Sequence, residues 1–317
     1  MYVVKRYFQP GDNDEQGFGM SEVLGDRCML EVESLPFWTG KIKIWPLTGG
    51  ITNRNFGVQQ PDGQRFAVRL GQDLPHHGVM RFNEQAAARA AAKIGISPKI
   101  FYTAPGVMIS RLLPGRTLTA QEIRHPDNLS RIVALLKRCH TDIGMHLAGP
   151  LLAFWVFHVN RSYAAALESY RARIAHELPR LMEINAELER RVGRVEIVFG
   201  HNDLLAANVF DDGARLWLLD WDYAGFNSPL FDLANLSSNN GFGAYDDAAL
   251  LGAYFGEPPN ETLWRGFHAF KCASLLREAL WGAVSEHTSV LDFDYKNYTE
   301  EYLARLEAAL AAEPSAA

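Results

Sequence analysis

Residues 201–225 have the sequence HNDLLAANVFDDGARLWLLDWDYAG, and this stretch decides which fold and chemistry to expect. Two strand-like runs flank an Asp-Asp-Gly tripeptide at 211–213, which is a strong hairpin signal. Such a hairpin would bring Asn208 and Asp220 to the same open end. An amide oxygen and a carboxylate are hard ligands that suit Mg²⁺, which also takes phosphate and water oxygens.

Asp203 lies in the loop just before this hairpin. Its carboxylate could orient an acceptor hydroxyl toward a phosphate and accept the proton of that hydroxyl. A base, an amide and a second carboxylate form the polar set that phosphoryl transfer from ATP requires. A single Asp or Asn in a loop usually serves a turn or a cap, but four polar residues in this order, His201 included, are poorly explained that way. The stretch therefore predicts a kinase.

The strings HNDLLAANVF and LLDWDYAGFNSPLFDLAN resemble the catalytic and metal-binding loops of the choline/ethanolamine kinases and the related aminoglycoside phosphotransferases. They look closer to the choline kinase branch. The resemblance implies an α+β fold like that of protein kinases. Such a fold has two lobes, a small one with an antiparallel sheet plus a helix, and a larger, mainly helical one.

The resemblance also implies roles for single residues. Asp203 would be the catalytic base, and the hairpin pair Asn208 and Asp220 would bind Mg²⁺, with ATP as the phosphate donor. His201 would support the loop by bonding to nearby backbone. Asp222 stays open between a carboxylate close to the metal ions and an ordinary surface aspartate at a strand end.

Length and composition narrow the class of protein. The 317 residues are 48% apolar, which is enough for one or two cores and about two domains. A net charge of −6 gives no basic surface for nucleic acid or an anionic membrane. The three cysteines have no CxxC spacing, so they indicate neither a disulfide framework nor a zinc site. With no apolar run of about 18 residues and no secretory signal, we expect a cytoplasmic protein. The sequence leaves a homodimer open.

The chain divides into three segments by its patterns. We expect an N-terminal extension over 1–20, a nucleotide-binding lobe over 21–112, and a catalytic and substrate-binding lobe over 113–317. In the first lobe, strands are expected at 41–45 and 64–70 and a helix at 81–94. Further helices are expected at 126–140, 161–177, 181–191, 246–254, 260–285 and 294–312.

A glycine pair marks the candidate nucleotide loop. Gly49 and Gly50 let backbone close over phosphates, and the amides of Thr52 and Asn53 can donate to phosphate oxygens. A glycine pair in a hairpin is usually only a turn. The loop lacks the Gly-Lys-Ser/Thr of a P-loop, which excludes a Walker-type NTPase. In choline kinases a similar GGxTN string forms the nucleotide loop, and this resemblance favours the functional interpretation.

Two further positions of the first half match the kinase pattern. Arg69, in FAVRL, stands where protein kinases have a strand lysine, and Glu84, in RFNEQ, falls on the following helix. Paired with Glu84, the Arg69 guanidinium could fork onto the α- and β-phosphates. An ordinary surface pair is the alternative, and Arg81 could face the site in place of Glu84. Met108 and Ser110 would present backbone groups to adenine, although an edge strand without a ligand would look the same.

The substrate question depends on the C-terminal helices. Trp281 and the aromatic residues of 293–298 could form a box for an ammonium group through cation–π contacts, although helical aromatics more often belong to a core. Resemblance to the choline-site helices of choline kinases favours Trp281 first and Tyr295 second. Eukaryotic choline kinases carry two tryptophans here, whereas this chain has Glu278 at the first position. Glu278 would attract a cation or pair with a neighbour on its helix.

Taken together, these features predict transfer of the γ-phosphate of ATP, with Mg²⁺, to the hydroxyl of a small amino alcohol. Choline is the first candidate acceptor and ethanolamine the second. One alternative keeps the chemistry and changes the acceptor to thiamine, an aminoglycoside or another small hydroxyl compound. The other is a kinase-like protein that binds a nucleotide or an amine without catalysis. The complete set of Asp203, Asn208 and Asp220 disfavours it.

Overall fold

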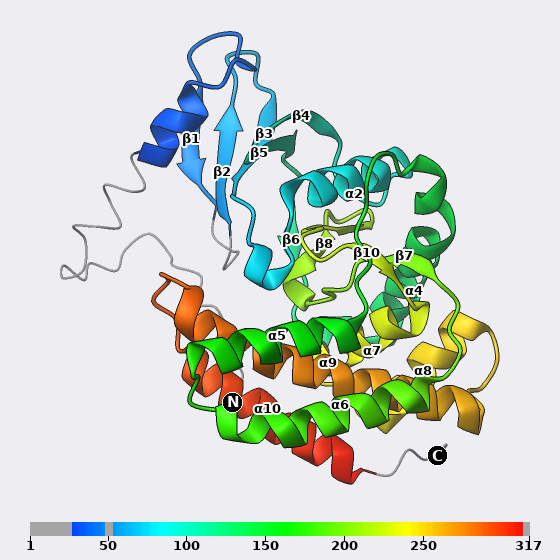
Figure 1. Cartoon of the computed structure of the whole chain (residues 1–317). Coiled ribbons are helices and arrows are strands. Elements are labelled where there is room, and N and C mark those ends of the chain that lie inside the picture. Colours follow the sequence, from blue (N-terminus) through cyan, green and yellow to red (C-terminus); the bar gives the residue numbers. More distant parts are fainter. Residues whose placement is uncertain (1–26, 48–52, 313–317) are drawn as a thin grey trace. The chain divides into compact units, whose positions relative to one another are not determined.

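The computed structural model describes residues 27–47 and 53–312, which fall into two compact units (Figure 1). The first unit comprises the described residues up to Gln72 together with Ile100–Leu112. The second comprises Asp73–Lys99 together with the described residues from Leu113 onward. The N-terminal extension that we expected over 1–20 lies outside the described residues. The helix expected at 81–94 groups with the second unit, although we assigned it to the first lobe.

The first unit is built on a five-stranded antiparallel sheet in the order β1-β2-β3-β5-β4. Its strands are β1 (Lys43–Pro46), β2 (Arg54–Gln59), β3 (Arg65–Leu70), β4 (Ile100–Ala104) and β5 (Val107–Arg111). Phe66, Val68 and Leu70 alternate along β3 and are buried, so one face of the sheet carries the core. A helical stretch over 27–33 adds Val32 to that core.

The second unit is mainly helical and is organised around one long buried helix, α9 (Glu261–Thr288). Helices α5, α6, α7 and α10 pack against α9 (Figure 1). A helix surrounded in this way buries apolar residues on all sides. The other helices are α2 (Arg81–Lys93), α3 (Ala120–Arg124), α4 (Pro126–Asp142), α5 (Val156–Tyr170), α6 (Leu178–Val192), α7 (Pro229–Asn240), α8 (Ala244–Phe255) and α10 (Tyr295–Ala311).

Short strands and single turns complete the second unit. Strand β8 pairs with β6 and β9, and β7 pairs with β10, all antiparallel. The strands are β6 (Arg116–Thr117), β7 (Val198–Gly200), β8 (Val209–Asp211), β9 (Leu216–Leu218) and β10 (Gly225–Asn227). The 3₁₀ turns are η1 (Pro75–His77), η2 (Ile143–His146), η3 (Ala175–Glu177) and η4 (Ala206–Asn208).

Most predicted elements are present, with ends that differ by a few residues; one helix was misplaced and one was not predicted. The helix expected at 161–177 runs over Val156–Tyr170, because Arg171 adopts a left-handed φ of 52° and caps its end. Helix α7 was missed entirely. Almost every residue of α7 is buried, so the sequence shows no amphipathic period there, although Ser228 and Gly241 provide cap signals.

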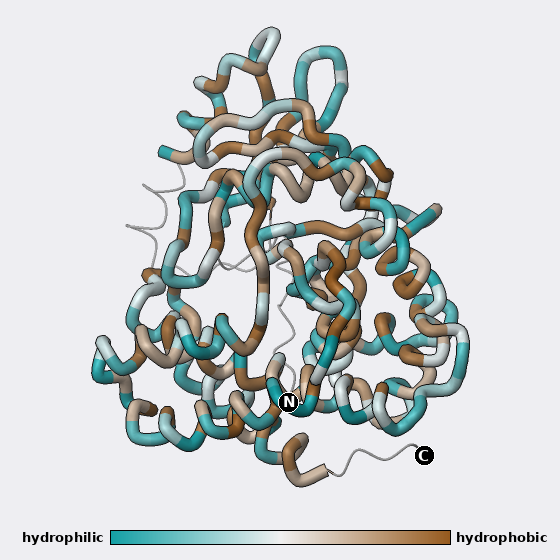
Figure 2. The backbone as a smooth tube through the Cα atoms, turned by 45° about the vertical axis from the view of Figure 1, so that its right-hand side comes forward, coloured by the Kyte–Doolittle hydropathy of each residue, from teal (hydrophilic) through white to brown (hydrophobic). Residues whose placement is uncertain are grey.

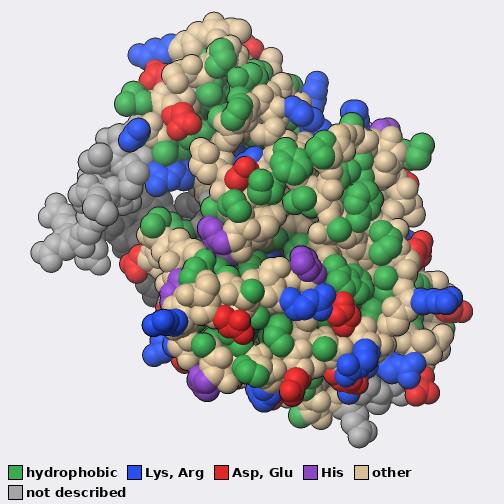
Figure 3. All heavy atoms as spheres, in the orientation of Figure 1, with side chains coloured by type: hydrophobic (Ala, Val, Ile, Leu, Met, Phe, Trp, Pro, Cys, Tyr) green, Lys and Arg blue, Asp and Glu red, His purple; other side chains and the backbone are tan. Residues whose placement is uncertain are grey.

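The surface is mixed in charge, and outer helices such as α4 and α6 are amphipathic. Figure 2 shows polar and apolar residues alternating along the helical segments, as expected for helices that bury one side. Figure 3 shows acidic and basic side chains intermixed on one face, and in α6 Glu187 pairs with both Arg190 and Arg191. Among the helices described, none combines the length and the apolar character needed to cross a membrane.

Candidate active site

The hairpin predicted around 211–213 forms from β8 and β9. Beyond the pair Val209 and Leu218, the N–H of Leu219 donates to the carbonyl oxygen of Asn208 at 2.9 Å. Asn208 and Asp220 therefore lie at the same open end. Asp220 has a φ of 66°, a left-handed conformation that costs a residue other than glycine about 1 kcal/mol and is typical of functional sites.

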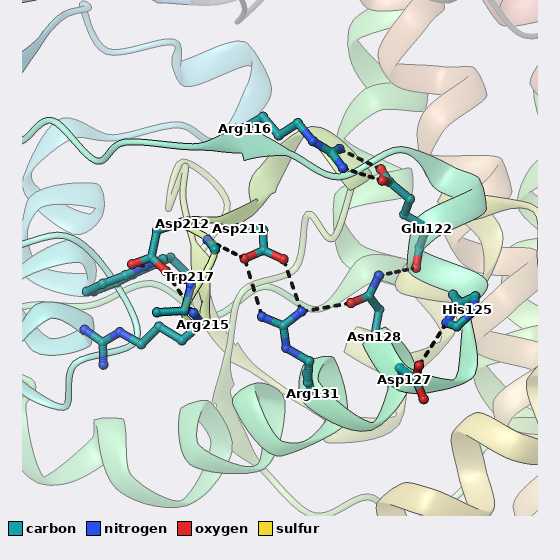
Figure 4. A network of polar contacts seen from close by, with 12 residues as sticks. Arg116, Glu122, His125, Asp127, Asn128, Arg131, Asp211, Asp212, Arg215 and Trp217 are labelled. Atoms are coloured by element: carbon teal, nitrogen blue, oxygen red, sulfur yellow. Dashed lines mark hydrogen bonds and ion pairs between the residues drawn. The ribbon is translucent and has the colours of Figure 1, made fainter.

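The closed end of the hairpin is anchored to α4 by polar contacts (Figure 4). Arg131 donates to both carboxylate oxygens of Asp211, at 3.1 and 3.4 Å. Asp212 accepts the indole N–H of Trp217 at 2.7 Å. Arg131 also donates to Asn128, at 3.0 Å. These bonds fix the turn, so the open end of the hairpin has a defined position within the second unit.

The Asp203 carboxylate is contacted from two sides. The amide nitrogen of Asn208 donates to its Oδ2 at 3.2 Å and to its backbone carbonyl at 2.8 Å. On the other side, a terminal nitrogen of Arg277 lies 3.6 Å from Oδ1. The side chain keeps 13% exposure, so the carboxylate is enclosed but still reaches the surface.

Burial raises the pKa of Asp203 to about 7. The neighbouring carboxylates of Glu278, Asp220 and Asp222 act in the same direction, and the Arg277 guanidinium opposes them. A carboxyl group with a pKa near neutrality suits a general base. Several negative groups in one place also suit a site that binds a cation.

Helix α7 holds residues 201–205, the predicted catalytic loop, through Asp232. The Asp232 carboxylate accepts the backbone N–H groups of His201 and Asn202, at 2.9 and 2.7 Å, and Nε2 of His140 lies 2.9 Å from it. Burial alone would raise the pKa of Asp232, but the bond to His140 and the backbone donors hold that pKa below its ordinary value. Asn235 adds a bond from the N–H of Leu204, at 2.6 Å.

His201 lies within hydrogen-bond distance of the loop backbone, consistent with the supporting role that we predicted. Its Nε2 lies 2.9 Å from the carbonyl oxygen of Leu219. Burial lowers its pKa, so the imidazole is neutral near pH 7. His201 therefore connects the catalytic loop to the end of β9, next to Asp220.

Asp222 is buried, which rules out the surface alternative left open by the sequence. Arg81 of α2 donates to Asp222 at 2.7 Å and to Glu84 at 2.5 Å, and all three side chains are at most 8% exposed. Because Arg81 pairs with both carboxylates, it joins α2 to the segment after β9. The predicted pair of Arg69 with Glu84 links residues of different units and stays a prediction.

The residues that we expect to bind the acceptor substrate form one aromatic cluster in the second unit. The indole N–H of Trp281 donates to the Tyr223 hydroxyl at 3.0 Å. The Trp281 ring lies 5.8 and 5.6 Å from the rings of Tyr295 and Tyr298, both edge to face. On another side the ring of His77 lies at 5.6 Å, and burial lowers the pKa of His77 to about 3.

Glu278 is engaged within this cluster. It forms an ion pair with Arg277, and its Oε2 accepts the Tyr298 hydroxyl at 2.7 Å. Of the two alternatives for Glu278, the contacts therefore correspond to pairing on its own helix. Tyr298 belongs to the aromatic segment 293–298 that was expected from sequence, whereas Tyr223 and Arg277 were not assigned to the site. The only signal for these two was their proximity along the chain to Asp220 and Trp281.

The candidate nucleotide residues lie mainly on the sheet of the first unit. Arg69 of β3 pairs in register with Met108 of β5, and Ser110 of β5 lies opposite Ala67. Asn53 is buried just before β2. Gly49, Gly50 and Thr52 lie outside the described residues. Binding of nucleotide by these residues stays a prediction.

Comparison with known proteins shows the family to which the chain belongs. Residues 44–249 match the family model described as choline/ethanolamine kinase. The chain belongs to the choline/ethanolamine kinase family. Membership implies a phosphotransferase that uses ATP and an alcohol acceptor. This bears out the predicted family and reaction class.

Relatives of this family member include proteins from an animal and a plant. Mouse ethanolamine kinase 2 is 24% identical over 307 residues, covering 87% of this chain and 79% of the relative. A probable choline kinase 2 from Arabidopsis thaliana is 24% identical over 300 residues, covering 82% of this chain and 83% of the relative.

Solved structures confirm the predicted α+β kinase-like fold. A choline/ethanolamine kinase family protein from Mesorhizobium loti has a TM-score of 0.75 and 25% identity, covering 91% of this chain and 95% of that one. An aminoglycoside phosphotransferase in complex with AMP-PNP and hygromycin B has a TM-score of 0.64 and 15% identity, covering 90% and 99%. The fold thus extends to both branches named from the sequence.

Proposed function

We propose that this protein transfers the γ-phosphate of ATP to the hydroxyl of a small amino alcohol, with choline the first candidate and ethanolamine the second. One observation carries the proposal. The Asp203 carboxylate, contacted by Asn208 and Arg277, lies beside the open end of the hairpin that ends in Asp220. In this arrangement Asp203 orients the acceptor hydroxyl and takes its proton as the phosphoryl group transfers in line.

The residues at the hairpin end fit a magnesium ion. The amide nitrogen of Asn208 donates to two oxygens of Asp203, so the amide oxygen is the atom that this side chain offers to a cation. Asp220 adds a carboxylate from the neighbouring strand end. Mg²⁺ bound by Asn208 and Asp220 would neutralise charge on the phosphates.

The hairpin end gives a prediction about metal dependence. Mg²⁺ with the ATP analogue AMP-PNP should stabilise the protein by about 2.7 kcal/mol at a ligand concentration of 100 Kd. In Asp220→Asn most of the metal-dependent stabilisation should be lost, because a neutral amide binds Mg²⁺ more weakly than a carboxylate. Thermal unfolding with AMP-PNP in Mg²⁺ and in EDTA measures both effects. Equal metal-dependent shifts in the variant and the wild type would contradict the assignment of Asp220.

The aromatic cluster supports an ammonium-bearing acceptor. The ring centres of Tyr295 and Tyr298 lie 5.8 and 5.6 Å from that of Trp281, and aromatic rings gathered in this way can attract an ammonium group. An aminoglycoside site would be expected to carry many carboxylates. In this cluster the one predicted carboxylate, Glu278, is engaged by Arg277 and Tyr298.

Trp281 gives a second prediction. Trp281→Leu should raise the KM for choline by about 10-fold, corresponding to a cation–π contact of 1–2 kcal/mol, with a smaller rise for the KM of ATP. Trp264→Leu is the matched control, because Trp264 is a buried tryptophan on the same helix. Steady-state kinetics in both substrates measures the effect. An unchanged KM for choline would remove Trp281 from the acceptor site.

The proposed function is tested by ADP release from ATP and Mg²⁺ in the presence of choline, ethanolamine, thiamine or kanamycin. We expect release that depends on choline or ethanolamine. Release only with thiamine or kanamycin would keep the catalytic loop and reject the ammonium box. No release with any acceptor would indicate a binding protein without catalysis.

A further inference from the structure

A buried arginine lies next to the predicted catalytic base and has no role in the function proposed so far. Arg277 is on α9, four residues before Trp281, so the two side chains project from the same face of the helix. Its side chain is 2% exposed. One terminal nitrogen pairs with Glu278 and lies 3.6 Å from Oδ1 of Asp203. A full charge is therefore held against the base inside the protein.

We propose that Arg277 is a positioning residue for phosphoryl transfer, which holds the Asp203 carboxylate in the orientation that receives the acceptor proton. This inference rests on the proposed function. Oδ1 of Asp203 faces Arg277, whereas Oδ2 accepts the amide of Asn208 at 3.2 Å. A carboxylate contacted at both oxygens cannot rotate freely. Restricting its rotation keeps a basic lone pair directed at the acceptor site.

Arg277 is itself held by the residues of the aromatic cluster. Its guanidinium carbon lies 4.2 Å from the ring centre of Tyr223, and the Tyr223 hydroxyl accepts the indole N–H of Trp281. Its partner Glu278 accepts the Tyr298 hydroxyl. A continuous set of contacts thus joins the candidate acceptor residues to the base. A planar guanidinium can stack and form ion pairs at once, which a lysine ammonium cannot do.

A purely structural role explains Arg277 less well. Among the residues that the structure describes, neither Nε nor the second terminal nitrogen of Arg277 has a hydrogen-bond partner, and both atoms are buried. Buried polar groups without partners destabilise a fold, and an apolar replacement of a buried ion pair often costs nothing. A charged side chain kept at this disadvantage is expected at a functional site.

The test compares substitutions that separate charge, packing and fold. Arg277→Met alone would leave Glu278 buried without its partner, so the informative variant is the double change Arg277→Met with Glu278→Gln. Glu278→Gln alone measures the contribution of the partner. Arg277→Lys keeps the charge and loses the planar group. Arg305→Met is the matched control, because Arg305 also lies over a tyrosine ring, 4.5 Å from that of Tyr302, on α10.

The readouts are kcat and the two KM values with the acceptor that the wild type prefers, and circular dichroism confirms the fold of each variant. For the double variant we expect kcat to fall by about 100-fold, the loss expected when a reacting group is misplaced by about 1 Å, with the KM of ATP nearly unchanged. Arg277→Lys should recover about 10-fold of that loss, since it restores the charge next to Asp203. Glu278→Gln leaves Arg277 buried without its ion-pair partner and should give an intermediate loss of kcat. Arg305→Met should retain a kcat close to that of the wild type.

The outcomes separate this inference from the function on which it rests. A folded double variant with a kcat within about twofold of the wild type would overturn the positioning role. Equal losses in the double variant and in Arg277→Lys, with a raised KM for ATP, would indicate a packing defect and would overturn it as well. A wild-type protein inactive with every acceptor would overturn the proposed function, and the role of Arg277 with it.

Discussion

Replacing Asp203 by Asn should lower kcat by about 10³-fold and leave nucleotide binding nearly unchanged. Asparagine keeps the shape of the side chain but cannot take the acceptor proton. The substitution leaves the predicted Mg²⁺ ligands Asn208 and Asp220 in place. Steady-state turnover and ATP-analogue binding measure the two halves of the prediction. Asp127→Asn is the control, because the Asp127 side chain is 91% exposed and lies outside the site. A kcat close to that of the wild type would refute the assignment of the base.

Asp203→Asn should raise the stability of the fold, although it lowers kcat. The pKa of Asp203 is raised in the folded state, from 3.8 to about 7, so ionising this group disfavours folding. Its favourable contribution is complete below pH 3.8 and is lost as the pH rises through about 7. Asp203→Asn should therefore unfold at a higher temperature than the wild type at pH 8, and the difference should disappear near pH 4. Thermal unfolding across this range checks the sign, and a less stable variant at pH 8 would contradict it.

Replacing Asp232 by Ala should cost about 3–5 kcal/mol of folding free energy. The carboxylate is fully buried and accepts from two backbone N–H groups and pairs with His140, all of which would lose their partner. This is a large part of the 5–15 kcal/mol that is typical of a folded protein. Urea unfolding measures the loss.

An exposed control position and the pH dependence both test the role of Asp232. Asp127→Ala applies the same change at an exposed position and should cost far less. The pKa of Asp232 is lowered in the folded state, so its stabilisation is present above the pKa of the unfolded chain and is lost at acidic pH. The difference in the free energy of unfolding between the wild type and Asp232→Ala should therefore become smaller as the pH falls. A cost below about 1 kcal/mol would show that α7 does not hold the catalytic loop.

The features that were predictable from sequence are local ones. The hairpin between Asn208 and Asp220 follows from two short apolar runs and a turn tripeptide, all within 25 residues. Helices α4, α6 and α10 follow from apolar periodicity over long segments. These patterns involve residues that are close together in the sequence, so they can be recognised without the tertiary structure.

The features that were missed depend on contacts between distant segments. Arg81 pairs with Asp222, which lies 141 positions away in the sequence. No local pattern around either residue predicts this pair. Arg277 likewise acquires its place beside Asp203 only when α9 packs in the second unit. From sequence alone, Glu278 could equally contact the substrate or pair with a neighbour on its helix, and in the structure it pairs with Arg277. Helix α7 was hidden because tertiary burial removed its amphipathic pattern.

Phosphorus NMR of a reaction mixture identifies the molecule that receives the phosphate from ATP. The protein is incubated with ATP, Mg²⁺ and choline or ethanolamine, with Asp203→Asn in parallel. We expect a phosphomonoester signal that matches the phosphorylated amino alcohol and grows with ADP, and that is almost absent for the variant. Inorganic phosphate without a phosphomonoester, or an equal signal from Asp203→Asn, would contradict the account.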